Sequence, residues 1–180
     1  MKILVTGFRP YATHEVNPSE EMLKRIHRDD VTTLLLPVEY DKAREILRKE
    51  IERNRPEAIL LLALSPFIKR PNIEQYAYNE MDSVQADEKG VVKINEKIYP
   101  EGAPSYPAGF DTFSIQQYVL SQGEKCDIAI DPGRFVANAV YYEALHSGIP
   151  SMLVHLPQEI NYPFDDTRES VEKILDYLDF

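Results

Sequence analysis

Residues 127–157 read DIAIDPGRFVANAVYYEALHSGIPSMLVHLP, and the local patterns of this stretch decide the fold. The apolar run at 127–130 predicts a short buried strand, which the break at 131–133 ends. A helix should follow, because apolar residues recur three and four positions apart at Val136, Ala139, Val140 and Ala144. A glycine and a proline at 148–150 end that helix, and 152–154 predicts a second buried strand with His155 at its end.

A strand, a tight glycine turn and a helix N-terminus are a common position for the nucleophile of an α/β enzyme. There the helix dipole and the free backbone N–H groups stabilise negative charge. A histidine at the end of the next strand would then serve as general base. The first turn of this helix, residues 134–138, contains no Cys, Ser or Thr. The stretch therefore predicts the frame of an active site without its nucleophile.

The remainder of the chain alternates apolar strand patterns with amphipathic helical patterns. Strands are expected at 2–6, 33–38 and 58–64, and helices at 41–54, near 113–122 and at 165–177. This alternation is typical of a parallel sheet covered by helices on both faces. At 180 residues, one domain spanning 1–180 is expected.

Composition narrows the class of protein further. The chain has 20 Lys and Arg against 30 Asp and Glu, and the net charge of −10 argues against nucleic acid as a partner. The single cysteine, Cys126, excludes an internal disulfide and fits a reducing, cytoplasmic compartment. No apolar run approaches the roughly 20 residues of a membrane span, so no membrane association is expected. We expect neither a metal nor a cofactor.

Two further segments have an ordinary structural interpretation. Asn17 followed by Pro18 predicts the capped start of a helix, with Glu20 completing a capping box. Glu74 lies in a polar, alternating stretch, and such a glutamate is most often a solvated strand residue.

Several motifs together resemble the pyroglutamyl peptidase I (pyrrolidone-carboxylate peptidase) family, cysteine peptidases that remove an N-terminal pyroglutamate. Residues 131–138 resemble the family segment Ser-Ala-Gly-x-Tyr/Phe-Leu/Val-Cys-Asn, with Ala137 at the position of the catalytic cysteine. Residues 153–157 resemble Phe-x-His-x-Pro, which places the catalytic histidine at His155. Residues 74–79 resemble Glu-Arg-x-Ala-x-Asn, which places the catalytic glutamate at Glu74.

The N-terminal segment extends the resemblance. Residues 6–19 are similar to the family signature Thr-Gly-Phe-x-Pro-Phe-Gly-Gly-x-x-x-Asn-Pro-Ser, and 102–104 match a Gly-Ala-Pro. The resemblance implies a substrate-binding set of Phe8, Tyr11, Asn17, Phe135 and Val136. It also implies a single-domain three-layer α/β/α sandwich around a mixed, mainly parallel sheet, often assembled as a homo-dimer or tetramer. Glu74, Ala137 and His155 should then converge at the C-terminal edge of the sheet.

The sequence also departs from the family pattern. Ala12-Thr13 replace a pair of glycines, Val84 replaces an arginine that helps to hold the oxyanion, and Phe67 and Ile68 replace a glycine-lined wall. Cys126 is not expected to substitute for the nucleophile, because it precedes a strand of about 13 Å that ends near the Gly133 turn.

Three hypotheses follow from the sequence. The chain is a catalytically silent homologue that still binds a pyroglutamyl peptide or a small cyclic amide. Alternatively, it is an active peptidase, either carrying a Cys-to-Ala substitution at Ala137 or using another nucleophile. The third hypothesis is a non-catalytic interaction subunit.

Overall fold

The computed structural model describes residues 1–179 and has a six-stranded sheet at its centre, in the order β2-β1-β3-β10-β4-β9. The strands of this sheet are β1 Ile3–Phe8, β2 Val31–Leu36, β3 Ala58–Leu64, β4 Asn72–Glu74, β9 Asp127–Ala129 and β10 Ser151–Leu156. Neighbouring strands run parallel except β4, which is antiparallel to β10. The sheet is therefore mixed and mainly parallel, as predicted.

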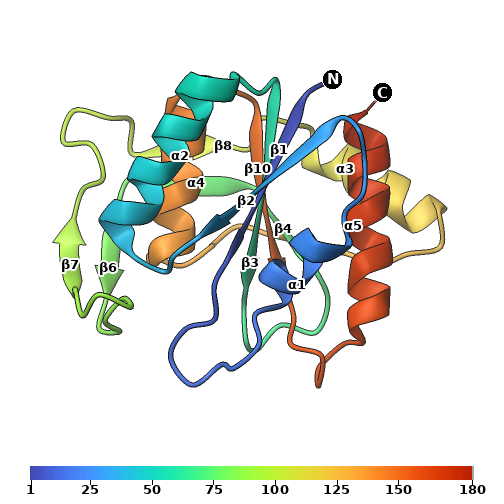
Figure 1. Ribbon diagram of the computed structural model, residues 1–180, viewed down its shortest axis with the longest axis horizontal. Coiled ribbons are helices and arrows are strands. Elements are labelled where there is room, and N and C mark those ends of the chain that lie inside the picture. Colours follow the sequence, from blue (N-terminus) through green and yellow to red (C-terminus); the bar gives the residue numbers. More distant parts are fainter. Residues whose placement is uncertain (180) are drawn as a thin grey trace.

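Within the described residues 1–179, five helices cover the two faces of this sheet (Figure 1). They are α1 Pro18–Arg25, α2 Tyr40–Asn54, α3 Thr112–Ser121, α4 Val136–His146 and α5 Phe164–Leu178. Helices α2 and α4 lie on one face, and α1, α3 and α5 lie on the other. These layers form the α/β/α sandwich that the sequence predicted. Among residues 1–179, no helix has the length and apolar character needed to cross a bilayer.

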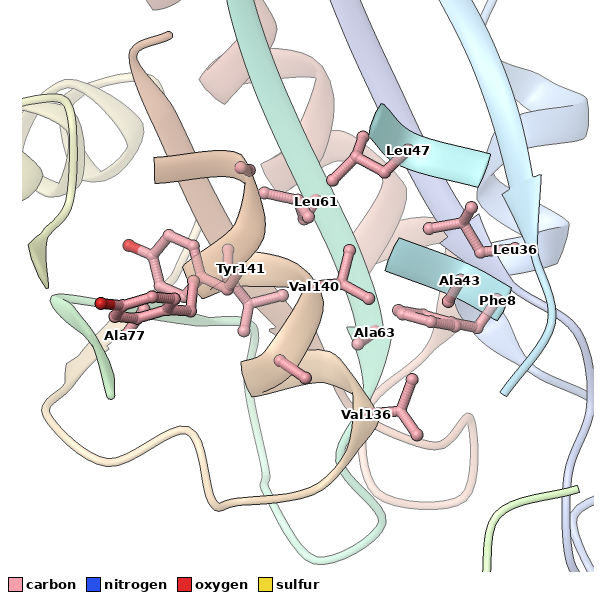
Figure 2. Close-up of a cluster of buried hydrophobic side chains, with 14 of the residues drawn as sticks. Phe8, Leu36, Ala43, Leu47, Leu61, Ala63, Ala77, Val136, Val140 and Tyr141 are labelled. Atoms are coloured by element: carbon pink, nitrogen blue, oxygen red, sulfur yellow. The ribbon is translucent and has the colours of Figure 1, made fainter. Parts of the chain in front are cut away.

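The continuous apolar run of β3 is explained by burial on both faces. Alternate side chains of a strand point to opposite faces, so Leu61 and Ala63 pack toward α2 and α4 while Leu62 packs toward α1, α3 and α5. Figure 2 shows Val136 and Val140 of α4 directed at the β3 side chains. The position of the α4 N-terminus is thus fixed by its own apolar stripe.

The two edges of the sheet differ from the sequence prediction. The predicted buried strand at 127–130 ends at Ala129, and the side chain of Ile130 is 63% exposed. Strand β9 is an edge strand, so one side of it faces solvent. Strand β2 is the other edge, and it lies two residues earlier than the predicted 33–38. Helix α4 starts at Val136 rather than at residue 134.

Two small antiparallel sheets of two strands each lie beside the α4 face of the main sheet. Strands β5 Tyr76–Tyr78 and β8 Ser105–Pro107 form one, and β6 Met81–Ser83 and β7 Lys93–Glu96 form the other. The β6–β7 hairpin projects from the body of the molecule (Figure 1).

The side chains of Asn138 and Asn79 hold the small sheets and their loops in place through hydrogen bonds to the backbone. The Asn138 side chain accepts a hydrogen bond from the Tyr78 amide and donates to the carbonyls of Tyr78 and Glu80. The Asn79 side chain holds the loop that follows β7, since it accepts from two backbone amides there and donates to the Tyr99 carbonyl. Both asparagines are buried, so these bonds satisfy polar groups that water does not reach.

Candidate active site

A cavity of about 340 Å³ opens where the C-terminal ends of β1, β3 and β10 meet the first turn of α4. It brings together every residue that the sequence suggested for the site. These residues are Phe8, Tyr11, Asn17, Glu74, Phe135, Val136, Ala137 and His155. The expected convergence of Glu74, Ala137 and His155 is therefore present.

Strand register explains how Glu74 reaches His155. In the antiparallel pair of β4 and β10, Glu74 lies opposite Leu153, and His155 is two residues further along the same face. Such diagonal neighbours are about 7–8 Å apart at Cα, within reach of long side chains. The face is the one covered by α4, because Leu153 packs in the same buried cluster as Val140. The first turn of α4 lines the same cavity as this pair.

The two side chains form a buried acid–base pair. Nδ1 of His155 lies 3.4 Å from Oε1 of Glu74, and the residues are 7% and 2% exposed. The Tyr141 hydroxyl donates to the backbone carbonyl of Glu74 at 2.8 Å, which fixes the end of β4. The interpretation of Glu74 as a solvated strand residue is wrong, because β10 and β9 flank it on both sides. A carboxylate in this position can orient an imidazole that acts as general base.

Ala137 contributes only a methyl group to the cavity that this pair lines. It is the second residue of α4, and its side chain is partly buried. The first i to i−4 bond of the helix runs from the Ala139 amide to the Phe135 carbonyl, so the amides before Ala139 have no acceptor within the helix. The cavity thus combines the His155–Glu74 pair with the N-terminus of α4. The side chain of Ala137 in that first turn cannot act as a nucleophile.

Cys126 is separated from the cavity, although for a different reason from the one predicted. Asn72 of β4 pairs with His155 of β10 on one side and with Asp127 of β9 on the other. Because β9 runs antiparallel to β10, Asp127 and His155 therefore lie at the same level across the sheet. The distance along β9 therefore does not separate Cys126 from His155. Instead, Cys126 packs on the opposite face of the sheet, in the cluster of α3 and α5, and is 2% exposed. Burial raises the pKa of its thiol to about 12, which disfavours the nucleophilic thiolate.

Aromatic rings form one wall of the cavity. The rings of Tyr11 and Phe135 are 6.2 Å apart, and Phe135 packs edge-on against Tyr40 at 5.5 Å. Phe8 is 3% exposed, and burial raises the pKa of the Tyr11 hydroxyl. These rings are packed against the core and would present a rigid apolar surface to a ligand.

Asn17 holds the loop that carries Tyr11. Its Oδ1 accepts bonds from the Ser19 amide and hydroxyl, and its Nδ2 donates to the Arg9 carbonyl. Asn17 is thus the predicted N-cap of α1 and also ties the loop to the end of β1. The second half of the predicted capping box is not formed, because the Glu20 carboxylate lies toward Lys24 at 3.8 Å.

Comparisons with known proteins agree with this geometry. The sequence profile described as pyroglutamyl peptidase matches residues 1–158. A pyrrolidone-carboxylate peptidase of Thermococcus kodakarensis is 35% identical over 186 residues, covering 95% of this chain and 88% of that protein. One from Fusobacterium nucleatum is 32% identical, covering 97% of this chain and 87% of that protein. The chain belongs to the pyroglutamyl peptidase family.

Solved structures of pyrrolidone carboxyl peptidases share the fold. The enzyme of Fervidobacterium islandicum superposes with a TM-score of 0.92 at 25% identity, over 99% of this chain and 98% of that chain. A mutant of the Pyrococcus furiosus enzyme superposes with a TM-score of 0.90 at 27% identity, over 98% and 97% of the two chains.

The structure places the three segments that were expected to depart from the family pattern. Val84 is 92% exposed and does not line the cavity, whereas the neighbouring Gln85 does. Of the two residues expected to replace a glycine wall, Ile68 lines the cavity but Phe67 is 89% exposed to solvent. Ala12 has a φ of 53°, a left-handed conformation that glycine adopts without strain.

Sequence reasoning missed several polar groups of the cavity. Ser65 follows β3, Asn72 lies opposite His155 in β4, and Asp131 precedes α4. The Asp131 carboxylate accepts from the Gly133 amide at 2.9 Å and from Arg134 at 2.7 Å, which lower its pKa. Ser65 could have been predicted as a cavity residue because it directly follows the apolar strand pattern of β3. No local sequence pattern identified Asn72 as a cavity residue. In the part of the chain that the structure describes, no cluster of three His, Cys, Asp or Glu residues could hold a metal ion.

Proposed function

We propose that this member of the pyroglutamyl peptidase family binds an N-terminal pyroglutamyl peptide or a small cyclic amide without cleaving it as a cysteine peptidase. One observation carries the proposal. The cavity keeps a buried Glu74–His155 pair and an aromatic wall, yet the helix position beside them is occupied by the methyl group of Ala137.

The lining suits a small, flat, neutral ring. Phe8, Tyr11 and Phe135 offer apolar surface to the ring carbons. A lactam also carries one N–H donor and one carbonyl acceptor, and polar groups from Ser65 and Asn72 line the same cavity. A largely apolar cavity with a few placed polar groups is the usual form of a small-molecule site, and about 340 Å³ lies at the small end of the range.

The chemistry of cleavage lacks its first step. In a cysteine peptidase, a histidine removes the thiol proton and the thiolate attacks the scissile carbonyl. An alanine methyl can do neither, and loss of the nucleophile in a comparable hydrolase lowers kcat by a factor on the order of 10⁶. Among the described residues that line the cavity there is also no Lys or Arg that could stabilise an oxyanion. Binding and catalysis are therefore separated in this chain.

Calorimetric titration with L-pyroglutamyl-alaninamide, paired with a fluorogenic pyroglutamyl amide, tests the proposal. We expect saturable binding and no release of the fluorophore above the rate without protein. Tyr11→Ala should weaken binding, because Tyr11 lines the cavity. Phe67→Ala is a suitable control, since this aromatic side chain is 89% exposed and lies outside the lining. Turnover that depends on His155 would overturn the proposal that the protein does not cleave its ligand. Absence of binding would overturn the proposal that the cavity takes a pyroglutamyl group.

A further inference from the structure

A second concavity of about 580 Å³ lies beside the cavity, between the loop after β1, the start of α1 and the loop from β10 to α5. We call it the acidic groove. Its lining includes three carboxylates, one guanidinium and four apolar side chains, namely Glu15, Glu21, Glu159, Arg25, Val16, Pro18, Ile160 and Phe164. In Figure 1 the loops after β1 and after β10 lie together at one end of the sheet, on either side of α1.

The cavity and the acidic groove are adjacent, because consecutive residues of the chain line one and the other. Asn17 lines the cavity and the next residue, Pro18, lines the groove, so their Cα atoms are about 3.8 Å apart. Tyr11 of the cavity contacts His14 of the groove with ring centroids 5.3 Å apart. An extended peptide advances about 3.3–3.6 Å per residue. A peptide whose first residue occupies the cavity therefore reaches the groove within a few residues.

The loops that form the groove are braced against each other. Nδ1 of His14 lies 3.2 Å from Nε2 of Gln158, and the Asn161 side chain donates to the carbonyl of Pro66 at 2.9 Å. These bonds join the loop after β1, the loop after β3 and the loop after β10. The groove is thus held open by the same loops that frame the cavity.

Charge determines which peptide the groove fits. Glu15 and Glu159 are exposed, and neither makes an ion pair or a side-chain hydrogen bond with another described residue. Glu21 is paired with Lys24 at 3.1 Å, and the Arg25 guanidinium lies 5.7 Å from the centre of the Phe164 ring. Two free carboxylates therefore flank the exposed apolar side chains of Val16 and Ile160. A segment with Lys or Arg side chains, whose alkyl stems cover apolar surface, complements this lining.

We propose that the acidic groove binds the residues that follow the N-terminal residue of a bound peptide and selects segments that contain Lys or Arg. This inference rests on the proposed function, because the cavity must hold the first residue. It adds a specificity that the cavity alone does not supply, since the cavity contacts only the terminal ring.

The test uses pyroglutamyl-Ala-Lys-Lys-amide and pyroglutamyl-Ala-Glu-Glu-amide, titrated calorimetrically at about 0.1 M salt. The net charge of −10 favours a basic peptide everywhere, so the groove must be separated from this general effect. The groove variant is Glu15→Gln with Glu159→Gln. The control is Glu52→Gln with Glu101→Gln, which removes the same charge at exposed positions outside both concavities.

We expect the lysine peptide to bind at least about fivefold more tightly than the glutamate peptide, as two weakly screened surface pairs allow. The groove variant should lose most of this ratio, and the control should retain it. Equal losses in the two variants, or no loss in either, would overturn the inference.

Two further measurements separate the outcomes. Pyroglutamic acid amide is too short to reach the groove, so its binding reports on the cavity alone. If it binds while the two long peptides bind equally, the groove inference is overturned and the proposed function stands. If it does not bind while the lysine preference persists and depends on Glu15 and Glu159, the proposed function is overturned instead. Sedimentation compares the oligomeric state of the wild type with that of the groove variant. A wild-type dimer that becomes a monomer in the groove variant would mean that a second copy of the chain occupies the groove, and the inference would be overturned.

Discussion

Nδ1 of His155 and Oε1 of Glu74 lie 3.4 Å apart, although the two residues are 81 positions apart in the chain. The contact depends on β4, a strand of three residues that runs against the direction of β10. This contact is long for a charge-assisted hydrogen bond, and such bonds often tighten only when ligand is present. Ala137 lines the same cavity as this pair and carries only a methyl group, so a thiol introduced at residue 137 is an informative change.

Ala137→Cys should create a thiol that is more reactive than Cys126. The new side chain would lie in the first turn of α4 beside His155, where the helix N-terminus and an imidazolium both favour the thiolate. Cys126 is buried, and its pKa of about 12 leaves little thiolate at pH 8. Labelling with iodoacetamide followed by peptide mass analysis compares the two thiols in one sample. Faster labelling of Cys126 would contradict the placement of Ala137.

The same variant should remain a poor peptidase. In the described part of the chain no Lys or Arg lines the cavity, and Val84 faces solvent. Loss of one oxyanion donor costs about 10²–10³ in rate. Hydrolysis of a fluorogenic pyroglutamyl amide is the measurement. A rate typical of an intact cysteine peptidase from this single substitution would show that the rest of the site is complete. The expectation of further defects beyond residue 137 would then be wrong.

Adding His155→Gln to Ala137→Cys should reduce labelling of residue 137 by about tenfold or more at pH 7. The imidazolium stabilises the thiolate, and a change of one pKa unit is a tenfold change in the thiolate fraction. His146→Gln is the control, because His146 is exposed at the far end of α4, stacked on Tyr99. Equal labelling of the two double variants would mean that His155 does not act on residue 137.

The parts of the fold that the sequence predicted well are those with local patterns. Strand β3 was predicted at its observed bounds, since burial on both faces leaves a run of apolar residues bounded by Pro56 and Ser65. Helix α2 was predicted within one residue, because its apolar stripe faces the sheet and its charges face solvent.

The features that were missed depend on neighbours distant in sequence. Burial of Glu74 follows from β9 and β10 on its two sides, and no pattern around residue 74 records either strand. The direction of β9 follows from the insertion of β4 beside β10, so β9 and β10, the strands before and after α4, run antiparallel to each other. Without that topology, the sequence could not show that Asp127 and His155 lie at the same level across the sheet.

Ala12→Gly should raise the free energy of unfolding by up to about 1 kcal/mol. Ala12 has a φ of 53°, where the Cβ of an L-residue is strained, and this relief outweighs the extra freedom that glycine gives the unfolded chain. Thr13→Gly is the control, because Thr13 is also exposed but does not have a positive φ. Urea unfolding should show a stabilised Ala12→Gly and a neutral or destabilised Thr13→Gly. The same direction of change in both variants would contradict strain at Ala12.

Gly102→Ala should lower the free energy of unfolding by about 1–3 kcal/mol, the usual cost of an extra methyl group in a packed site. A Cβ at this position would collide with the hydroxyl of Tyr142 and lie 3.1 Å from Cβ of Tyr99. The φ of Gly102 is not in the left-handed region, so lack of space is the reason for the glycine. Urea denaturation with an unchanged m-value measures the effect.

Tyr142→Phe separates this collision from a general disturbance of the loop. The Tyr142 hydroxyl donates to the carbonyl of Ala103 at 2.7 Å, so its removal alone should cost about 1 kcal/mol. In the Tyr142→Phe background the new methyl group no longer meets the hydroxyl, and Gly102→Ala should cost less than in the wild type by about 0.5–1 kcal/mol or more. Strict additivity of the two substitutions would mean that the hydroxyl is not what excludes a side chain at residue 102. The Gly-Ala-Pro motif would then need a reason other than the packing of α4 against this loop.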